Sequence, residues 1–196
     1  MLDLTTSKKI VDYCKARKYP IDNFNIIYLE GLNINGVLNA DEPNQFNDVR
    51  CIFDKTKCLD CWQATCEPGY WYTDRPMNPN GAFRIAFGFH SKAWKIGLHG
   101  YSDEHEALVQ VDEVRGYRDY NRDMKRINDL EVVGNFGINQ HWGYDLPAVD
   151  IGQASAGCLV GRTRFGHRQF MEYCKNSGLD LFSTIVLPAN EVFAYY

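Results

Sequence analysis

The sequence lacks any long apolar run. None of its hydrophobic stretches approaches the roughly 20 consecutive residues that a membrane-spanning helix needs. Residues 1–18 also lack the apolar core of a cleavable signal peptide. We therefore expect no membrane span and synthesis in the cytoplasm. If the substrate lies outside the cell, we expect a route other than a cleavable signal.

The sequence also lacks an excess of positive charge, internal repeats and low-complexity linkers. The formal net charge is -4, which gives no electrostatic reason to expect nucleic acid as a partner. The chain has 196 residues, of which 45% are hydrophobic, so it is long and apolar enough to bury a core of its own. These features indicate a globular protein that folds as one compact unit.

A complete disulfide framework is excluded, because the seven cysteines are an odd number. Four of them have the spacing C-x6-C-x2-C-x4-C: Cys51, Cys58, Cys61 and Cys66. One C-x2-C pair suits a zinc knuckle, but a firm zinc signal needs a second matched pair. We expect free buried thiols, no metal and no cofactor; structural zinc and a disulfide remain the alternatives.

Two further patterns suggest metal sites only weakly. Asp119, Asn121 and Asp123 alternate as in a calcium loop, but Met124 stands where such a loop has its turn glycine. A polar hairpin with local ion pairs is the simpler interpretation. His99 and His105 do not have the spacing of a helical zinc motif, so we consider them as residues that line a substrate cleft.

Secondary-structure signals indicate strands with helices near both ends. A helix is expected over residues 8–17, capped by Ser7, and another after Thr163 that Gly178 closes. Asn- and Gly-rich residues 31–50 read as surface turns. The expected strands are residues 26–29, 70–73, 83–87, 94–98, 107–111, 114–117 and 181–187. The predicted fold class is α+β with a mainly antiparallel, β-rich core.

The candidate chemistry lies in two short segments, residues 137–143 and 154–162. A cysteine attacks as its thiolate, and a nearby imidazole lowers the thiol pKa and takes the proton. We predict that Cys158 is the nucleophile, that His141 activates it, and that the pKa of Cys158 is depressed. Ser155, Ala156 and Gly157 are small enough for a tight turn, whose amides at Gly157 and Cys158 could form an oxyanion hole.

These segments resemble the signature of the L,D-transpeptidase (YkuD-type) catalytic domain, in which a histidine precedes Ser/Thr-His-Gly-Cys. His141 occupies the first place and Ser155-Ala156-Gly157-Cys158 the second. With Ile138-Asn139 before the histidine, the sequence is most similar to a Ser-Ala-Gly-Cys variant associated with bacterial and phage cell-wall proteins. The resemblance implies an L,D-transpeptidase-like catalytic domain over residues 67–196. Residues 1–66 would form an N-terminal helix and Asn/Cys-rich segment packed on that core.

The sequence departs from the family pattern at two places. Ala156 replaces the histidine before Gly-Cys, and Val160 replaces an arginine two residues after the cysteine; the nearest arginine is Arg162. Roles tied to those two family residues therefore do not carry over. Because these departures affect the acceptor side of the reaction, they favour hydrolysis over the synthesis of cross-links.

The resemblance implies a cysteine-dependent hydrolase of peptidoglycan stem peptides, acting at the bacterial cell wall. The carbonyl of Trp142 would hold the tautomer of His141, as in the family it resembles. The expected delivery, without a signal peptide, is by a virion or by lysis, as for a phage endolysin with virion or tail partners. The alternatives are an L,D-transpeptidase that forms cross-links, a non-catalytic structural or wall-binding virion protein, and a cysteine amidase or peptidase of another fold. The substrate-binding candidates are Trp142, Tyr144, Arg162, His99 and His105.

Overall fold

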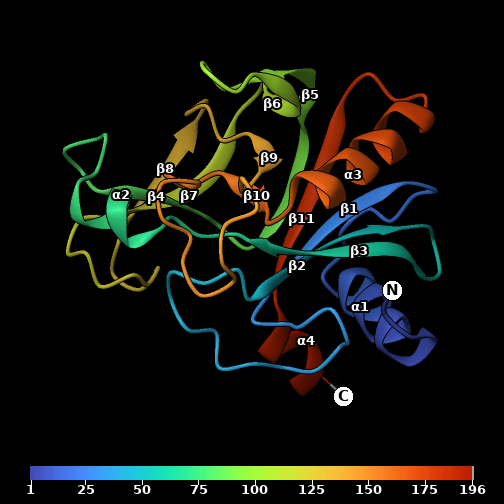
Figure 1. Ribbon diagram of the computed structural model, residues 1–196. Helices are drawn as coiled ribbons and strands as arrows, with labels where there is room; N and C mark the ends of the chain where they lie inside the picture. Colours follow the sequence, from blue (N-terminus) through green and yellow to red (C-terminus); the bar gives the residue numbers. More distant parts are fainter. Residues whose placement is uncertain (196) are drawn as a thin grey trace.

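The computed structural model describes residues 1–195, which form an α+β fold around a closed β-barrel (Figure 1). Eight strands close the barrel in the order β1-β11-β5-β6-β9-β10-β3-β2. Their bounds are β1 Asn25–Glu30, β2 Asp48–Phe53, β3 Cys58–Thr65, β5 Gly88–His99, β6 His105–Gln110, β9 Gln140–Trp142, β10 Leu159–Gly161 and β11 Phe182–Pro188.

A second, three-stranded sheet lies beside the barrel. It contains β4 (Ala82–Ile85), β7 (Val114–Asp119) and β8 (Leu130–Gly134) in the order β4-β7-β8. Among the strands of residues 1–195, only the pairs β1–β11 and β9–β10 are parallel. The predicted α+β class with mainly antiparallel strands is therefore confirmed.

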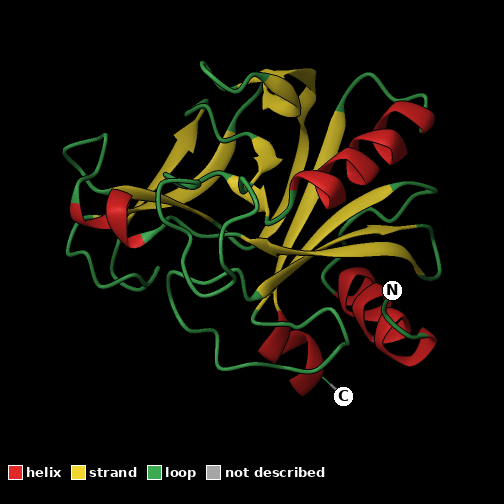
Figure 2. Cartoon of the chain, viewed as in Figure 1, coloured by secondary structure: helices red, strands yellow, loops and turns green. Residues whose placement is uncertain are grey.

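Four helices lie around the strands (Figure 2). They are α1 (Leu4–Ala16), α2 (Tyr70–Asp74), α3 (Arg164–Asn176) and α4 (Ala189–Ala194). Thr163 caps α3 as predicted, since its side chain accepts a hydrogen bond from the Gly166 amide. None of the helices in residues 1–195 combines the length and the apolar character needed to cross a membrane.

Three local predictions are wrong. Residues 48–50, expected among the surface turns of residues 31–50, belong to the buried strand β2. The cap of α1 is Asp3, whose carboxylate accepts from the Thr6 amide at 2.7 Å; Ser7 lies inside the helix, where its hydroxyl accepts from Cys58. Residues 70–73 form α2 instead of a strand. Aromatic residues favour strands only where they pack on a pleated surface, and Tyr70 and Trp71 are instead largely exposed.

Residues 1–66 contribute three strands, β1, β2 and β3, to the same barrel as residues 67–195. Strand β1 is apolar on both of its faces, because each face packs into a different core. Ile26 and Tyr28 point into the core that α3 covers, while Ile27 and Leu29 point into a second core beneath α1 and α4. Side chains alternate along a strand, so burial on both faces explains a continuous apolar run.

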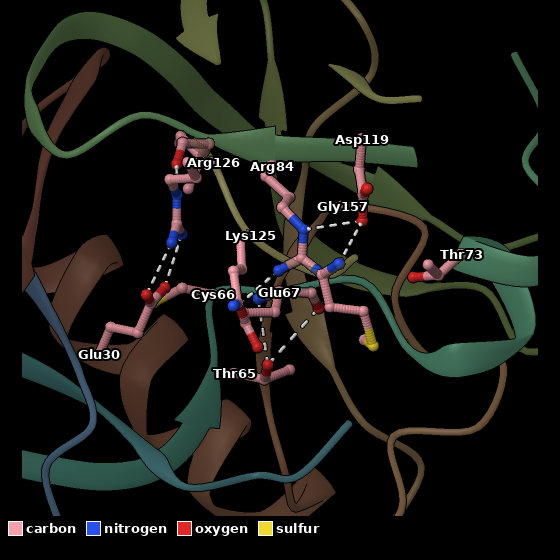
Figure 3. A network of polar contacts seen from close by, with 12 residues as sticks. Glu30, Thr65, Cys66, Glu67, Thr73, Arg84, Asp119, Lys125, Arg126 and Gly157 are labelled. Carbon is pink, nitrogen blue, oxygen red and sulfur yellow. Dashed lines mark hydrogen bonds and ion pairs between the residues drawn. The ribbon is translucent and has the colours of Figure 1, made fainter. Parts of the chain in front are cut away.

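A buried network of charges joins the small sheet to the barrel (Figure 3). The Arg84 side chain is fully buried and pairs with Glu67 and with Asp119, the latter at 3.3 Å. Arg126 forms a bidentate ion pair with Glu30 of β1: Nη1 and Nη2 of Arg126 donate to Oε1 and Oε2 of Glu30 at 2.7 and 2.6 Å. Burial raises the pKa of Glu67 to about 7, although the charge of Arg84 opposes the rise. The network therefore places charges where water cannot stabilise them.

We predict that Arg84→Met strongly destabilises the protein, because it leaves two buried carboxylates without their shared cation. The expected loss in the free energy of unfolding is about 3–5 kcal/mol, measured by urea denaturation. The control is Lys8→Met, which breaks the exposed pair of Lys8 with Asp12 and should cost about 0.3–0.5 kcal/mol. Equal losses in the two variants would contradict the prediction.

Candidate active site

His141 lies on β9, Cys158 immediately precedes β10, and both side chains reach the same cavity. In the parallel pair β9–β10, His141 is the register partner of Val160, and Cys158 lies two residues before Val160. Cys158 itself lies outside β10, directly after the turn at Gly157, so the shared cavity and not strand alternation places the two side chains together. The cavity has a volume of about 500 Å³, and both residues line it.

The turn before Cys158 requires glycine. Gly157 has a φ of +127°, and a Cβ atom there would lie 2.5 Å from the carbonyl oxygen of Phe83. Ser155 braces this turn: its hydroxyl donates to the Cys158 carbonyl at 2.9 Å and accepts from the Gly157 amide at 3.1 Å. The predicted tight turn is confirmed, and Ala156 lines the cavity beside it.

The predicted pair of oxyanion donors needs a correction. The Gly157 amide donates to Ser155 in this structure, so it does not point freely at a developing oxyanion. The amide of Cys158 remains the candidate donor in the turn. A single amide stabilises a tetrahedral intermediate less than two do.

The tautomer of His141 follows from its hydrogen bond. Its Nδ1 lies 2.8 Å from the carbonyl oxygen of Trp142. A carbonyl only accepts, so Nδ1 carries the proton and Nε2 keeps the lone pair of a base. This is the orientation that the sequence analysis predicts for the Trp142 carbonyl.

His99 stacks directly on His141. The ring centroids are 3.9 Å apart and the planes differ by 13°. The side-chain amide of Asn139 donates to Nδ1 of His99 at 2.9 Å, which makes that nitrogen an acceptor. Burial lowers the pKa of His99 to about 4, so the ring is neutral near pH 7. The neutral His99 ring packs against the His141 ring and holds it in place, and it does not compete with His141 for the Cys158 thiol proton.

The electrostatics favour a neutral thiol and a neutral imidazole. Burial raises the pKa of the Cys158 thiol to about 11, although a hydrogen bond with the Asn139 backbone acts to lower it. Burial, the neighbouring His99 and His105, and the charge of Arg50 together hold the pKa of His141 well below its usual value. The predicted depressed pKa of Cys158 is therefore wrong for the resting protein: desolvation outweighs the histidine when no imidazolium forms.

The other substrate-binding candidates divide into two groups. His99 and Tyr144 line the cavity with Cys158. His105 and Trp142 stack on each other, with centroids 3.7 Å apart, and line a separate cavity of about 320 Å³. Arg162 is bound to Gln63 at 2.6 Å and to the carbonyl of Leu146 at 3.0 Å. The prediction that His105, Trp142 and Arg162 contact the substrate at Cys158 is therefore not supported by their positions.

The cavity is also lined by a cation, Arg118, that the sequence patterns did not indicate. Arg118, on β7, lies over the rings of Phe83 and Phe136, 5.4 and 5.0 Å from their centroids. Gln110 holds the neighbouring segment in place, because its side-chain oxygen accepts from the amides of Phe136 and Ile138. Only the pairing of the small sheet brings these residues to the cavity, so no local pattern could have identified them.

The four N-terminal cysteines considered as metal ligands divide into two places in the structure. Cys51, Cys58 and Cys61 gather with their sulfur atoms within 4.8 Å of one another, whereas Cys66 lies with Glu30 and Asp48. All seven cysteines are free thiols. In the acidic hairpin, Asp119 pairs with Arg84 and accepts from the Asp123 amide at 3.1 Å, and Asn121 donates to the Asp123 side chain. The hairpin is polar as expected, but its ion pairs are not local: Asp119 pairs with Arg84, and Arg122 pairs with Asp74. Carboxylate oxygens of Asp119, Asp123 and Asp129 lie within 4.8 Å of one another.

Compared with protein-family models, with curated proteins and with solved structures, the chain matches none of them. The geometry of the site therefore carries the functional argument.

We predict that alkylation of Cys158 by iodoacetamide rises about tenfold per pH unit between about pH 6 and pH 9, because the thiolate fraction grows at that rate below the pKa. Site-resolved peptide mass spectrometry measures it. Cys61 is an internal control: hydrogen bonds from Cys51 and Cys58 lower its pKa to about 3, so its labelling should not vary with pH. A plateau for Cys158 near pH 6–7 would reveal a thiolate–imidazolium pair and contradict the prediction.

Proposed function

We propose that this protein is a cysteine-dependent hydrolase of peptidoglycan stem peptides, of the L,D-transpeptidase type. The observation that carries the proposal is the shared cavity of Cys158 and His141, with Nε2 of His141 left as a base by the Trp142 carbonyl. The sequence resemblance supplies the substrate class. The site of action would be the cell wall, reached with a virion or by lysis.

The reaction follows from the resting protonation states. Nε2 of His141 takes the thiol proton while the sulfur of Cys158 attacks the peptide carbonyl, so no thiolate is needed beforehand. The tetrahedral intermediate collapses to a thioester, and His141 gives the proton to the departing amine. Water, deprotonated by His141, then hydrolyses the thioester and restores the thiol.

Hydrolysis is preferred over transfer because of the residues around the turn. Ala156 lines the cavity where the resembled family has a histidine. Val160 is buried in an apolar cluster with Phe46 and Ile151, and Arg162 is held by Gln63. Neither position offers a group that binds an incoming amine, so water is the more accessible acceptor.

Arg118 is the proposed partner for the carboxylate of a stem peptide. It is the arginine that lines the cavity in the described chain, and burial lowers its pKa without removing its charge at neutral pH. The surrounding walls carry Tyr72, Phe83, Phe136 and Tyr144, which suit the apolar parts of a peptide. Recognition would thus combine one charge with aromatic surfaces.

One observation favours a different class of function. The raised pKa of Cys158 is also what a packing cysteine shows, and it would fit a virion protein that binds peptidoglycan without turnover. Binding of purified peptidoglycan by the wild type, with no released peptides, would support that second function.

We predict that Cys158→Ala abolishes release of stem-peptide fragments, because it removes the nucleophile. His141→Gln should lower the rate by about 10²–10⁴-fold, the usual contribution of a general base. Mass spectrometry of digested peptidoglycan measures both. The matched control is His90→Gln, at a buried histidine that contacts the Ala86 carbonyl and does not line the cavity; its activity should be retained. Full activity of Cys158→Ala would exclude the mechanism.

The pH dependence of kcat/KM should be flat around neutrality. The acid limb reflects protonation of His141, whose lowered pKa moves that limb below about pH 6.5. The thiol, with a pKa of about 11, adds no rise between about pH 7 and pH 9. Steady-state assays on a soluble stem peptide test this. An activity that increases tenfold per unit from pH 7 to 9 would show that pre-formed thiolate is the reactive species.

A further inference from the structure

A cluster of three cysteine sulfur atoms lies outside the proposed active site. Cys51 on β2 and Cys61 on β3 are direct cross-strand partners. Cys58 is three residues before Cys61 and would face the other side of a regular strand. The register shift between Ile52 and Phe53 turns Cys58 to the same face. All three sulfur atoms consequently lie within 4.8 Å of one another.

The cluster belongs to the core beneath α1, not to the core beside Cys158. Cys51 and Cys58 are buried there with Ile10 and Val11 of α1, and Cys61 packs against the same group. Cys58 is further fixed by its amide, which donates to the buried Ser7 hydroxyl at 3.1 Å. Cys61 is only half-buried, so an ion has a path from solvent.

We propose that Cys51, Cys58 and Cys61 form a three-thiolate site for a thiophilic divalent ion, of which zinc is the physiological example. Three sulfur atoms bound to zinc at about 2.3 Å with tetrahedral angles lie about 3.8 Å from one another. Sulfur atoms already within 4.8 Å therefore need only small side-chain adjustments. Water supplies the fourth ligand at the open side beside Cys61.

The charge beside the cluster suits such an ion. The N-terminal ammonium interacts with the Cys61 sulfur. Cysteines bind zinc as thiolates, so each thiol that becomes a ligand releases its proton to solvent. Three thiolates and one Zn²⁺ carry a net charge of -1, which the neighbouring ammonium offsets.

This inference replaces the expectation of free thiols for three of the four N-terminal cysteines. Cys66 is excluded from the site, because it lies with Glu30 and Asp48 in a different buried cluster. The C-x2-C pair identified in the sequence is thus completed by Cys51 from the neighbouring strand, not by a second C-x2-C pair. The inference is independent of the proposed peptidoglycan activity, since no cysteine is shared.

The test is a titration of the whole chain, reduced and freed of metal with a chelator, with Cd²⁺. Binding is monitored by the thiolate-to-metal charge-transfer absorption in the ultraviolet. A second titration with Zn²⁺, in competition with a chromophoric chelator, gives the zinc affinity. We expect one ion per chain. Cys61→Ser should weaken binding by about tenfold or more and reduce the absorption. This variant is the informative one, because Cys61 is the half-buried member and its replacement should leave the fold intact.

Cys158→Ser is the matched control, since it also replaces a half-buried thiol. It should bind one ion like the wild type while losing the proposed hydrolase activity, which separates the two proposals. Absence of charge-transfer absorption in the wild type would overturn the metal site. Unchanged affinity in Cys61→Ser would overturn it as well.

Discussion

The remaining structure depends on two buried ion pairs that share Arg84, one with Glu67 and one with Asp119. They tie β4 and β7 of the small sheet to the chain that leaves β3 (Figure 3). The neighbouring Phe83 carbonyl packs against Gly157 so closely that no side chain fits there. This close contact joins the turn before Cys158 to β4, whose Arg84 belongs to the charge network. Loss of one partner would leave a buried charge uncompensated.

The same burial that positions the site also controls its reactivity. Desolvation raises the pKa of Cys158 and lowers that of His141, so both groups are neutral at rest. In the proposed mechanism, the reaction would therefore depend on proton transfer from Cys158 to His141 when substrate binds, not on a thiolate formed beforehand. Stacked His99 and the Trp142 carbonyl keep Nε2 of His141 as the basic nitrogen, which is the feature that such a mechanism requires.

Cysteines in this chain show how far the surroundings determine chemistry. Burial raises the pKa of Cys158 in its cavity, while the neighbouring Cys51 and Cys58 thiols and the N-terminal ammonium lower the pKa of Cys61. Residue type alone predicts neither. In the proposed functions, one environment supplies a nucleophile that ionises only during attack, and the other supplies a ligand set for a soft ion.

The sequence by itself determined the features that depend on neighbouring residues. The Thr163 cap of α3, the strand at β1 and the Ser155–Cys158 turn were all predictable, because capping, apolar runs and glycine turns are local. Tertiary structure alone decided what depends on register and burial. The bulge that gathers Cys58 with Cys51 depends on the register of the β2–β3 pair, whereas the position of Arg118 in the cavity and the direction of the Cys158 pKa shift depend on segments distant in sequence. Pairing and desolvation act across space, so no local pattern encodes them.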